Sequence, residues 1–529
     1  MNHLTKKTKY GLRGAGRRTL AMTIATFAFA TSACMVGPNY RRPSAPQSPT
    51  FKELPPPSSP EAQIWKEAQP GDQMLRGNWW EVFDDAQLNQ LEEQVAISNQ
   101  NVLTFEAQYR AARAAIGIAR SNLFPVVNGT ATVTNTRTPT STSAAISAAP
   151  ASKTTRTNYQ IAAEATWQPD VWGNLRRGVT ASRRTAQATF ADLENAKLSY
   201  QATLAQAYLG LRATEEQQQL LQRTVVSYQD YRQLTQLRLN AGIASGADVA
   251  QAETQLANAK TQLTDLGIAR AQFEHAIAVL MGKPPSALTI PSGTMNATLP
   301  EIPVTLPSTL LERRPDIAAA ERRMAATNEQ IGIAKAAYYP NLTLSATGGL
   351  EGTDPAQWFT WPSRFWSLGP QVAQTIFSAG RRHAQVEQAQ ALYDADVAGY
   401  RQTVLTAFQQ VEDNLASLRL LSNEAGSSAD AVKAAQENLD ITNYQYKAGI
   451  VSSLNVIIAQ SAALQAQITA IDIHTRQLTS SVLLIEALGG GWDTSKLTSG
   501  TQIPYQNNPS SVPTKTTKQT TPASSAPKP

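Results

Sequence analysis

The chain contains the same short phrase twice, IGIARSNLFPVV beginning at Ile116 and IGIAKAAYYPNL beginning at Ile331. Each copy runs into a proline, Pro125 in the first and Pro340 in the second. Proline cannot donate to the hydrogen-bond ladder of a helix, and it disfavours helical geometry in the residue before it. We therefore expect each copy to mark a point where a helix gives way to a strand.

Other segments recur in the same order, which predicts two homologous halves, residues 76–300 and residues 301–492. AGIASGADVAQA at Ala241 recurs as AGIVSSLNVIIA at Ala448, and WGNLRR at Trp172 recurs as FSAGRR at Phe377. The spacing is much longer than the roughly 20–50 residues of a solenoid repeat. A duplicated domain is therefore the better interpretation.

Long helices are predicted by apolar residues that step by three and four. In the first half this pattern runs over residues 183–240 without a proline, and it resumes over 249–280 after a turn at 242–246. The second half repeats the pattern around a turn at 449–453. Small residues along these seams let helices approach closely, so we predict long, antiparallel, coiled-coil-like hairpins.

After each proline junction the period becomes two, which predicts β-strands in the regions 125–172 and 340–377. Apolar and polar residues alternate cleanly in three strands, whereas a fourth, at 366–377, is less regular and contains Pro370. The strands are long enough for the apolar band of a membrane barrel. Half of a soluble sandwich remains an alternative on this pattern alone.

The number of strands bears on assembly. Four strands cannot close a barrel, because small barrels begin at about eight strands. Several copies of the chain must therefore share one barrel, and symmetric homo-oligomers are the common solution.

The N-terminal residues 1–33 have the form of a secretory signal peptide, with a basic start and then an apolar run. They hold no Asp or Glu and carry the whole formal net charge of +6, so we expect no nucleic-acid partner. Cys34, the one cysteine, follows Ser32 and Ala33 as in a bacterial lipobox, which predicts a lipid-modified mature N-terminus. Met35 in place of Asp implies sorting to the outer membrane.

The remaining segments are simpler. Proline-rich residues 34–75 are predicted to form an extended arm, and the low-complexity residues 493–529 a disordered tail. The mature chain offers no run of about 18 consecutive apolar residues, so we expect no transmembrane helix. RRPDI at Arg313 predicts the start of a helix, with Pro315 at its first position and Asp316 complementing its dipole.

Four motifs together resemble the outer-membrane factor family, the TolC-like channels of tripartite resistance-nodulation-division efflux pumps, in its lipoprotein branch. They are CMVGPNYRRP at Cys34, WWEVFDDAQLNQLEEQVAISNQNV at Trp79, LPSTLLERRPDIAAAERRM at Leu306 and ALGGGW at Ala487. The resemblance covers about residues 34–492. It implies a mainly α fold with a β membrane part, in which helical hairpins form a periplasmic barrel and four strands per chain join a twelve-stranded barrel shared by a homotrimer.

The resemblance also implies a function and partners. It implies an outer-membrane exit channel that passively conducts small molecules from the periplasm to the exterior. The partners would be a periplasmic adaptor protein, an inner-membrane efflux pump and the outer-membrane lipid. A protein-secretion channel and a non-conducting coiled-coil lipoprotein tether remain alternatives, and lipid-facing apolar strand faces would argue against the tether.

A gate is implied at the hairpin turns, where the family constricts the periplasmic mouth. The positions that match the family's gate are Asp248 and Tyr446, which we expect to share a hydrogen bond, although packing by Tyr446 and helix capping by Asp248 is the alternative. The acidic pore-facing positions of the family are here Asn455 and Ile458. We therefore expect an apolar ring of Leu454 and Ile458 in place of an acidic one.

No catalytic constellation is evident. His275, His383 and His474 are far apart, and with Cys34 modified a histidine–cysteine metal site is not expected. Neither H-E-x-x-H nor G-x-S-x-G occurs. We predict a protein that is not an enzyme and has no cofactor other than the covalent lipid on Cys34.

Overall fold

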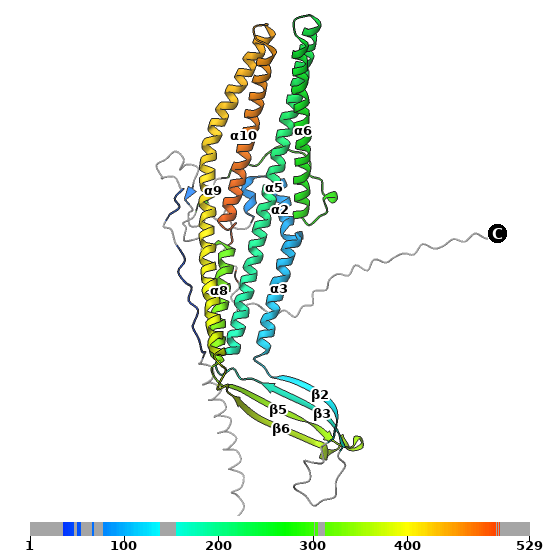
Figure 1. The fold of residues 1–529 in the computed structure, drawn as a ribbon, viewed down its shortest axis with the longest axis vertical. Coiled ribbons are helices and arrows are strands. Elements are labelled where there is room, and N and C mark those ends of the chain that lie inside the picture. Colours follow the sequence, from blue (N-terminus) through cyan, green and yellow to red (C-terminus); the bar gives the residue numbers. More distant parts are fainter. Residues whose placement is uncertain are drawn as a thin grey trace, which may run out of the picture.

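The computed structural model describes residues 35–46, 50–53, 66–67, 78–137, 155–300, 302–304, 313–492, 495 and 497. The predicted signal peptide, Cys34, most of the proline-rich arm and nearly all of the tail lie outside these residues. The described part is an elongated bundle of helices with a β-sheet at one end and two hairpin tips at the other (Figure 1).

The two halves have the same order of elements, a helix, two strands and two longer helices. The first half contains α3 (Gln100–Ser121), β2 (Val126–Arg137), β3 (Thr155–Trp167), α5 (Asn174–Asn240) and α6 (Gly246–Leu280). The second contains α8 (Pro315–Ala336), β5 (Asn341–Gly352), β6 (Arg364–Ala373), α9 (Arg381–Lys447) and α10 (Ser453–Ala487). Matching helices have equal lengths of 22, 67 and 35 residues, as copies of one ancestral unit would have.

The first half is preceded by a short 3-10 helix η3 (Trp79–Phe83) and by α2 (Ala86–Ser98). Three further short 3-10 helices, η4 (Pro285–Ala287), η5 (Pro355–Gln357) and η6 (Trp361–Ser363), lie in connections. Two two-residue strands, β1 (Lys66–Glu67) and β4 (Pro303–Val304), pair in parallel. The predicted helix start at Pro315 is confirmed, with Asp316 in the first turn of α8.

The four long strands form one antiparallel sheet in the order β2-β3-β5-β6. Its register places Val133 opposite Tyr159, and Ile161 opposite Leu350, so the apolar residues share one face as the alternation predicted. The fourth strand is Arg364–Ala373 rather than 366–377. Within this chain β6 is an edge strand, which is where prolines are found in sheets.

The long helices pair as hairpins, α5 with α6 and α9 with α10, and α5 also runs beside α8 and α10. The largest apolar cluster lies at the middle of the bundle, where Leu88 of α2, Leu204 of α5 and Val482 of α10 are fully buried together. Among the described helices, α10 alone is long and apolar enough to cross a membrane by length and composition. Its residues Val456, Ile473 and Val482 are buried, and 33% of its apolar window is buried in all.

The N-terminal segment runs as an extended strap along α8 and α9 (Figure 1). At the sheet end, the Val36 N–H donates to Trp172 O, and Arg177 Nε donates to Val36 O at 2.7 Å. Gly37 has a φ of +109°, and a Cβ there would lie 2.5 Å from Gly332 Cα, so only glycine fits this crossing. Farther along, Tyr40 donates to Glu321 Oε1 at 2.7 Å.

The far end of the strap reaches the middle of the bundle. Phe51 is buried against Phe408, and the N–H groups of Lys52 and Glu53 both donate to the Glu412 carboxylate. The strap thus connects the helix–strand junction to the central core through contacts along its length.

Candidate functional site at the hairpin tips

Both hairpin turns use the same backbone device. Gly242 and Gly449 each have a φ of +75°, and the following Ile243 and Ile450 donate back to Arg238 O and Gln445 O, both at 2.8 Å. This is the Schellman ending of a helix, which requires a left-handed residue and therefore favours glycine. The repeated Ala-Gly-Ile sequence encodes the two tips, and both isoleucines are exposed.

The helices that leave the two turns begin differently. Ser245 and Asp248 form a capping box, in which the Asp248 carboxylate accepts from Ser245 N at 2.8 Å and the Ser245 hydroxyl accepts from Asp248 N. In α10 the Ser452 side chain makes no such cap and instead donates to Asn455 Oδ1 at 2.7 Å. The structure therefore shows the capping role that was the alternative for Asp248.

Asp248 also reaches the other hairpin. Its Oδ1 accepts a short hydrogen bond from the hydroxyl of Ser453, and the Tyr231 hydroxyl donates to Ser453 O at 3.0 Å. The bonds from Ser453 and then Ser245 lower the pKa of Asp248. Because the pKa is lowered on folding, the stabilisation from the ionised Asp248 carboxylate is present above the unfolded-state pKa and is lost only as the pH falls through the folded-state pKa. The contact between Asp248 and Ser453 is therefore insensitive to pH near neutrality.

Arg238 and Tyr446 form a second contact between the two hairpins. Arg238 Nη2 donates to Tyr446 O at 2.9 Å, and its guanidinium lies over the Tyr446 ring, 4.0 Å from the centroid. A cation at the last carbonyls of α9 is favourable because of the helix dipole. The ring is buried and lies against Tyr231, with the centroids 5.6 Å apart.

The predicted bond between the Tyr446 hydroxyl and the Asp248 carboxylate is wrong for this conformation. Within the described residues Asp248 takes Ser453 as its partner on the second hairpin, and the route from there to Tyr446 passes through Tyr231. We call the five residues that join the tips the inter-hairpin latch: Tyr231, Arg238, Asp248, Tyr446 and Ser453.

Sequence reasoning missed three members of the latch, Tyr231, Arg238 and Ser453. Ser453 stands in the first turn of a predicted helix, where a serine is ordinarily interpreted as local capping. Its partner is 205 residues away, so no local spacing could indicate the contact.

The three positions of the predicted ring all lie on the outer face of α10. Leu454 is 48% exposed and Ile458 is 60% exposed, and Asn455 is also exposed. Leu454 and Ile458 are four residues apart and therefore form one apolar strip. A second, parallel pair of exposed apolar residues, Ile441 and Tyr444, lies on α9.

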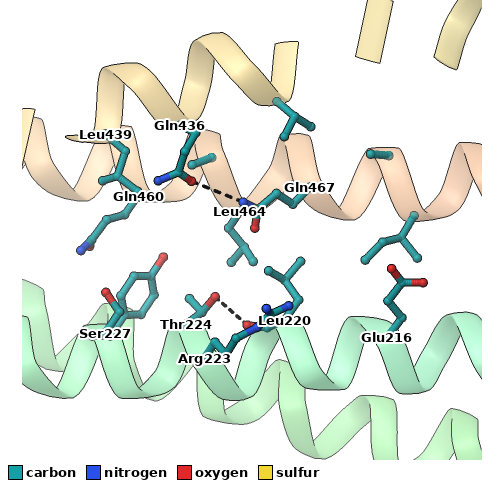
Figure 2. A pocket seen from close by; sticks show the side chains of 15 residues that line it. Glu216, Leu220, Arg223, Thr224, Ser227, Gln436, Leu439, Gln460, Leu464 and Gln467 are labelled. Carbon is teal, nitrogen blue, oxygen red and sulfur yellow. Dashed lines mark hydrogen bonds between the residues drawn. The ribbon is translucent and has the colours of Figure 1, made fainter. Parts of the chain in front are cut away.

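Two cavities lie between the hairpins, on the side of the latch that faces the middle of the bundle. A cavity of about 480 Å³ lies between α5, α9 and α10, and a second of about 430 Å³ lies between α5, α6 and α10. Leu220, Gln460 and Leu464 line the first cavity (Figure 2), and Gln460 Oε1 is buried with no hydrogen-bond partner there. Cavity walls lack the dispersion contacts of a packed seam, so relative movement of the hairpins costs little here.

Within the described residues no cluster of three His, Cys, Asp or Glu side chains could hold a metal ion. The contacts of this site are hydrogen bonds, a cation–π contact and apolar contacts between two helical hairpins. Such a site can hold two tips together or release them.

The chain is similar to known proteins in sequence and in fold. The family model described as outer membrane efflux protein matches residues 91–283 and 306–490, one segment in each half. TtgC of Pseudomonas putida, a probable efflux pump outer membrane protein, is 30% identical over 476 residues, covering 89% of this chain and 95% of that protein. Outer membrane protein OprJ of Pseudomonas aeruginosa is 30% identical over 469 residues, covering 88% and 95%.

Solved structures of outer-membrane channels have a similar fold. The outer-membrane channel OprN has a TM-score of 0.77 and 28% identity, with 87% of this chain and 100% of that chain covered. The CmeC outer membrane channel of Campylobacter jejuni has a TM-score of 0.79 at 22% identity, covering 87% and 96%, and shows the shared fold. The chain therefore belongs to the outer membrane efflux protein family, is located in the outer membrane and has the fold of its TolC-like channels.

Proposed function

We propose that this protein is the outer-membrane exit channel of a tripartite efflux system. It passively conducts small molecules from the periplasm to the exterior, and a periplasmic adaptor and an inner-membrane pump open it. It has no catalytic role and no cofactor. The observation that carries the proposal is the combination of a membrane-type sheet at one end with an inter-hairpin latch at the other.

The sheet supports assembly from several copies. Among the described strands, β2 and β6 each pair on one side only, which leaves two free edges. The apolar face is also open, with Val127, Val133, Leu368 and Val372 each more than 60% exposed. Free edges and an apolar face require partners, and closure of a shared barrel provides both. We propose a homotrimer, with four strands per chain in a twelve-stranded barrel.

These exposed strand faces also argue against a non-conducting tether. A tether needs no surface for lipid, whereas an apolar band is what a membrane barrel presents. Two relatives from Pseudomonas putida are an outer membrane protein of a toluene efflux pump and one of an antibiotic efflux pump. Small organic molecules are thus the proposed class of cargo.

The latch is the proposed gate. The latch joins the two hairpins at their tips. The cavities between the latch and the middle of the bundle leave the hairpins free to move. If three copies meet around one axis, Leu454 and Ile458 form an apolar ring, with Asn455 beside it and no acidic side chain in the strip. An apolar constriction resists wetting and so adds a second barrier.

Conductance in a planar bilayer tests the function. We expect the purified protein to form discrete channels that are mostly closed. Leu454→Ser should increase the open probability, because it makes the constriction wettable without touching the latch. Ile268→Ser serves as the control, since Ile268 is an exposed residue of α6 away from the tips. If neither the wild-type protein nor Leu454→Ser produced any single-channel current, the result would contradict the exit-channel proposal and favour the tether.

We also propose that Cys34 carries a covalent lipid that anchors the chain in the outer membrane. The position of Met35, which follows Cys34 in the sequence, supports this proposal. Met35 packs on Gly173, where a Cβ would come within 2.8 Å of Met35 Cγ, at the junction between β3 and α5. Met35, the residue that follows Cys34 in the sequence, thus lies at this end of the bundle, close to the sheet.

Cys34→Ser is expected to yield a chain without lipid that still contains folded helical hairpins. Mass spectrometry of the mature N-terminus measures this, with the wild-type protein as the acylated reference. Cleavage at another position, or an unmodified Cys34 in the wild type, would contradict the anchor and leave the channel proposal intact.

A further inference from the structure

The end of the sheet farthest from the helices carries aromatic and basic side chains on the apolar face. Trp366 and Arg364 continue the face of Leu368, because alternate residues of a strand share a face. Arg137 continues the face of Val133 in the same way. The register links the two strands, since Val133 lies opposite Tyr159, Tyr159 opposite Gly352, and Leu350 opposite Arg364.

We call this region the distal rim. It consists of Arg137, Tyr159, Trp358, Phe359, Trp361, Arg364 and Trp366. Phe359, Trp361 and Trp366 are 72%, 77% and 81% exposed, which is unusual for side chains of this size. The Tyr159 and Trp358 rings lie 5.6 Å apart, and the Arg364 guanidinium lies over the Trp361 ring.

The seven residues of the distal rim include two arginines and no carboxylate, and the exposed Asp354 lies nearby in the connection before Trp358. Residues 126–163 contain Arg137, Lys153 and Arg156 and no Asp or Glu. Glu351 lies opposite Gln160 and bonds to Asn158, so it belongs to the other face of the sheet. Within the described residues neither Arg137 nor Arg364 pairs with a carboxylate, and Arg364 Nε donates to Trp361 O at 3.3 Å, which leaves its two terminal nitrogens for an anion.

The location specifies the kind of anion. The helices of this family extend into the periplasm, so the distal end of the sheet faces the outer leaflet and the exterior. Aromatic girdles mark the boundary between acyl chains and headgroups in such proteins. Arg364 is in register with Ala131 through Leu350 and Ile161, and Arg137 lies six residues farther along β2. The two arginines, on the lipid-facing side, therefore enter the headgroup region at different depths.

We propose that the distal rim binds the phosphorylated saccharide headgroup of an anionic glycolipid in the outer leaflet. Arg137 and Arg364 bind phosphate groups, for which the planar guanidinium offers two parallel donors. Trp366, which is 81% exposed, presents a flat surface against which a sugar ring packs. A zwitterionic phospholipid fits less well, because its ammonium group adds positive charge to a rim that is already basic.

The sheet supplies a matched control. Arg156 lies opposite Thr136, next to Arg137, and it is similarly exposed. It shares its face with Asn158 and Gln160, so it lies at the same height as the rim on the opposite side of the sheet. Arg156→Gln removes the same charge as Arg137→Gln without altering the lipid-facing side.

The experiment is native mass spectrometry of the full-length protein in detergent, titrated with diphosphoryl lipid A. We expect Arg364→Gln and Arg137→Gln each to weaken binding by about tenfold, the loss of a charge-assisted contact to phosphate. Arg156→Gln should bind the lipid as the wild type does. Arg364→Lys should have an intermediate affinity, because lysine keeps the positive charge but lacks the two parallel donors of the guanidinium. Monophosphoryl lipid A should bind more weakly than the diphosphoryl form.

Several results would overturn the proposal. Unchanged binding in both rim variants would show that the arginines do not recognise the headgroup. Equal weakening in Arg156→Gln would indicate a general effect of charge, and equal affinity for phosphatidylethanolamine would indicate ordinary lipid contact. Full competition by millimolar inorganic phosphate would indicate a free-anion site. None of these outcomes affects the exit-channel proposal, which the bilayer measurement tests separately.

Discussion

Asp248→Ala is expected to raise the open probability of the channel by about tenfold or more. The substitution removes the bond from Ser453 that joins the two hairpins. A partly exposed hydrogen bond contributes about 0.5–1.5 kcal/mol, and three copies in the proposed trimer act on one gate. Each 1.4 kcal/mol is a factor of about ten in the closed-to-open ratio. Single-channel recording in planar bilayers measures the change.

Two further variants separate the latch from the helix cap. Ser245→Ala removes the capping box and keeps the Asp248–Ser453 contact, so it should leave the gate nearly closed. Ser453→Ala removes the contact and keeps the cap, so it should behave like Asp248→Ala. The double variant of Asp248 and Ser453 should be little worse than either single one, which is the signature of a coupled pair. Additive effects would show that the two residues do not form one contact, and a large effect of Ser245→Ala would indicate that capping alone matters.

Arg177→Met is expected to destabilise the helix–strand junction by about 3–5 kcal/mol, the usual cost of leaving one partner of a buried ion pair alone. Arg177 is 1% exposed, lies 2.6 Å from Glu329 and also bonds to Val36 O. Its loss leaves the Glu329 carboxylate buried without its cation and frees the start of the strap. Chemical denaturation followed by tryptophan fluorescence measures the stability, and limited proteolysis measures release of the strap.

Arg183→Met is the matched control, because Arg183 lies on the same helix and makes no ion pair among the described residues. Adding Glu329→Leu to Arg177→Met should recover part of the lost stability, since it removes the unpaired carboxylate. Equal stability of the Arg177 and Arg183 variants would show that the buried pair contributes nothing. Failure of Glu329→Leu to recover stability would locate the effect in the strap contact instead.

The sequence predicted the long helices and three of the strands because their periodicity reflects burial directly. It placed the start of the first long helix at residue 183, whereas α5 begins at Asn174. The missing turns contain Arg177, a charged residue at a buried position, and a hydrophobic pattern cannot identify such a position as core. It also extended the fourth strand too far, because Ile376 and Phe377 are apolar. Pairing stops where β5 begins, at Asn341 opposite Ala373.

The candidate gate was predicted only in its location. The glycine turns and Asp248 were visible because turn chemistry and capping are local in sequence. The partner of Asp248 was not visible, because a contact between hairpins depends on how α10 packs against α5 and α6, which no local pattern in the sequence specifies. A small rotation of any of these helices exchanges one neighbour for another, and so Ser453 rather than Tyr446 faces the carboxylate.

The strap has a consequence for the order in which the protein folds. Its partners lie far along the chain, with Val36 bonded to Arg177 across 141 residues, Tyr40 to Glu321 across 281 and Lys52 to Glu412 across 360. Contacts of such long sequence separation form late, because the intervening chain must first be ordered. Residues 35–53 belong to the early part of the chain to leave the ribosome, yet we expect them to reach their final positions only after α5, α8 and α9 have assembled. The strap, although it is near the N-terminus, is thus expected to be among the last parts of the protein to fold.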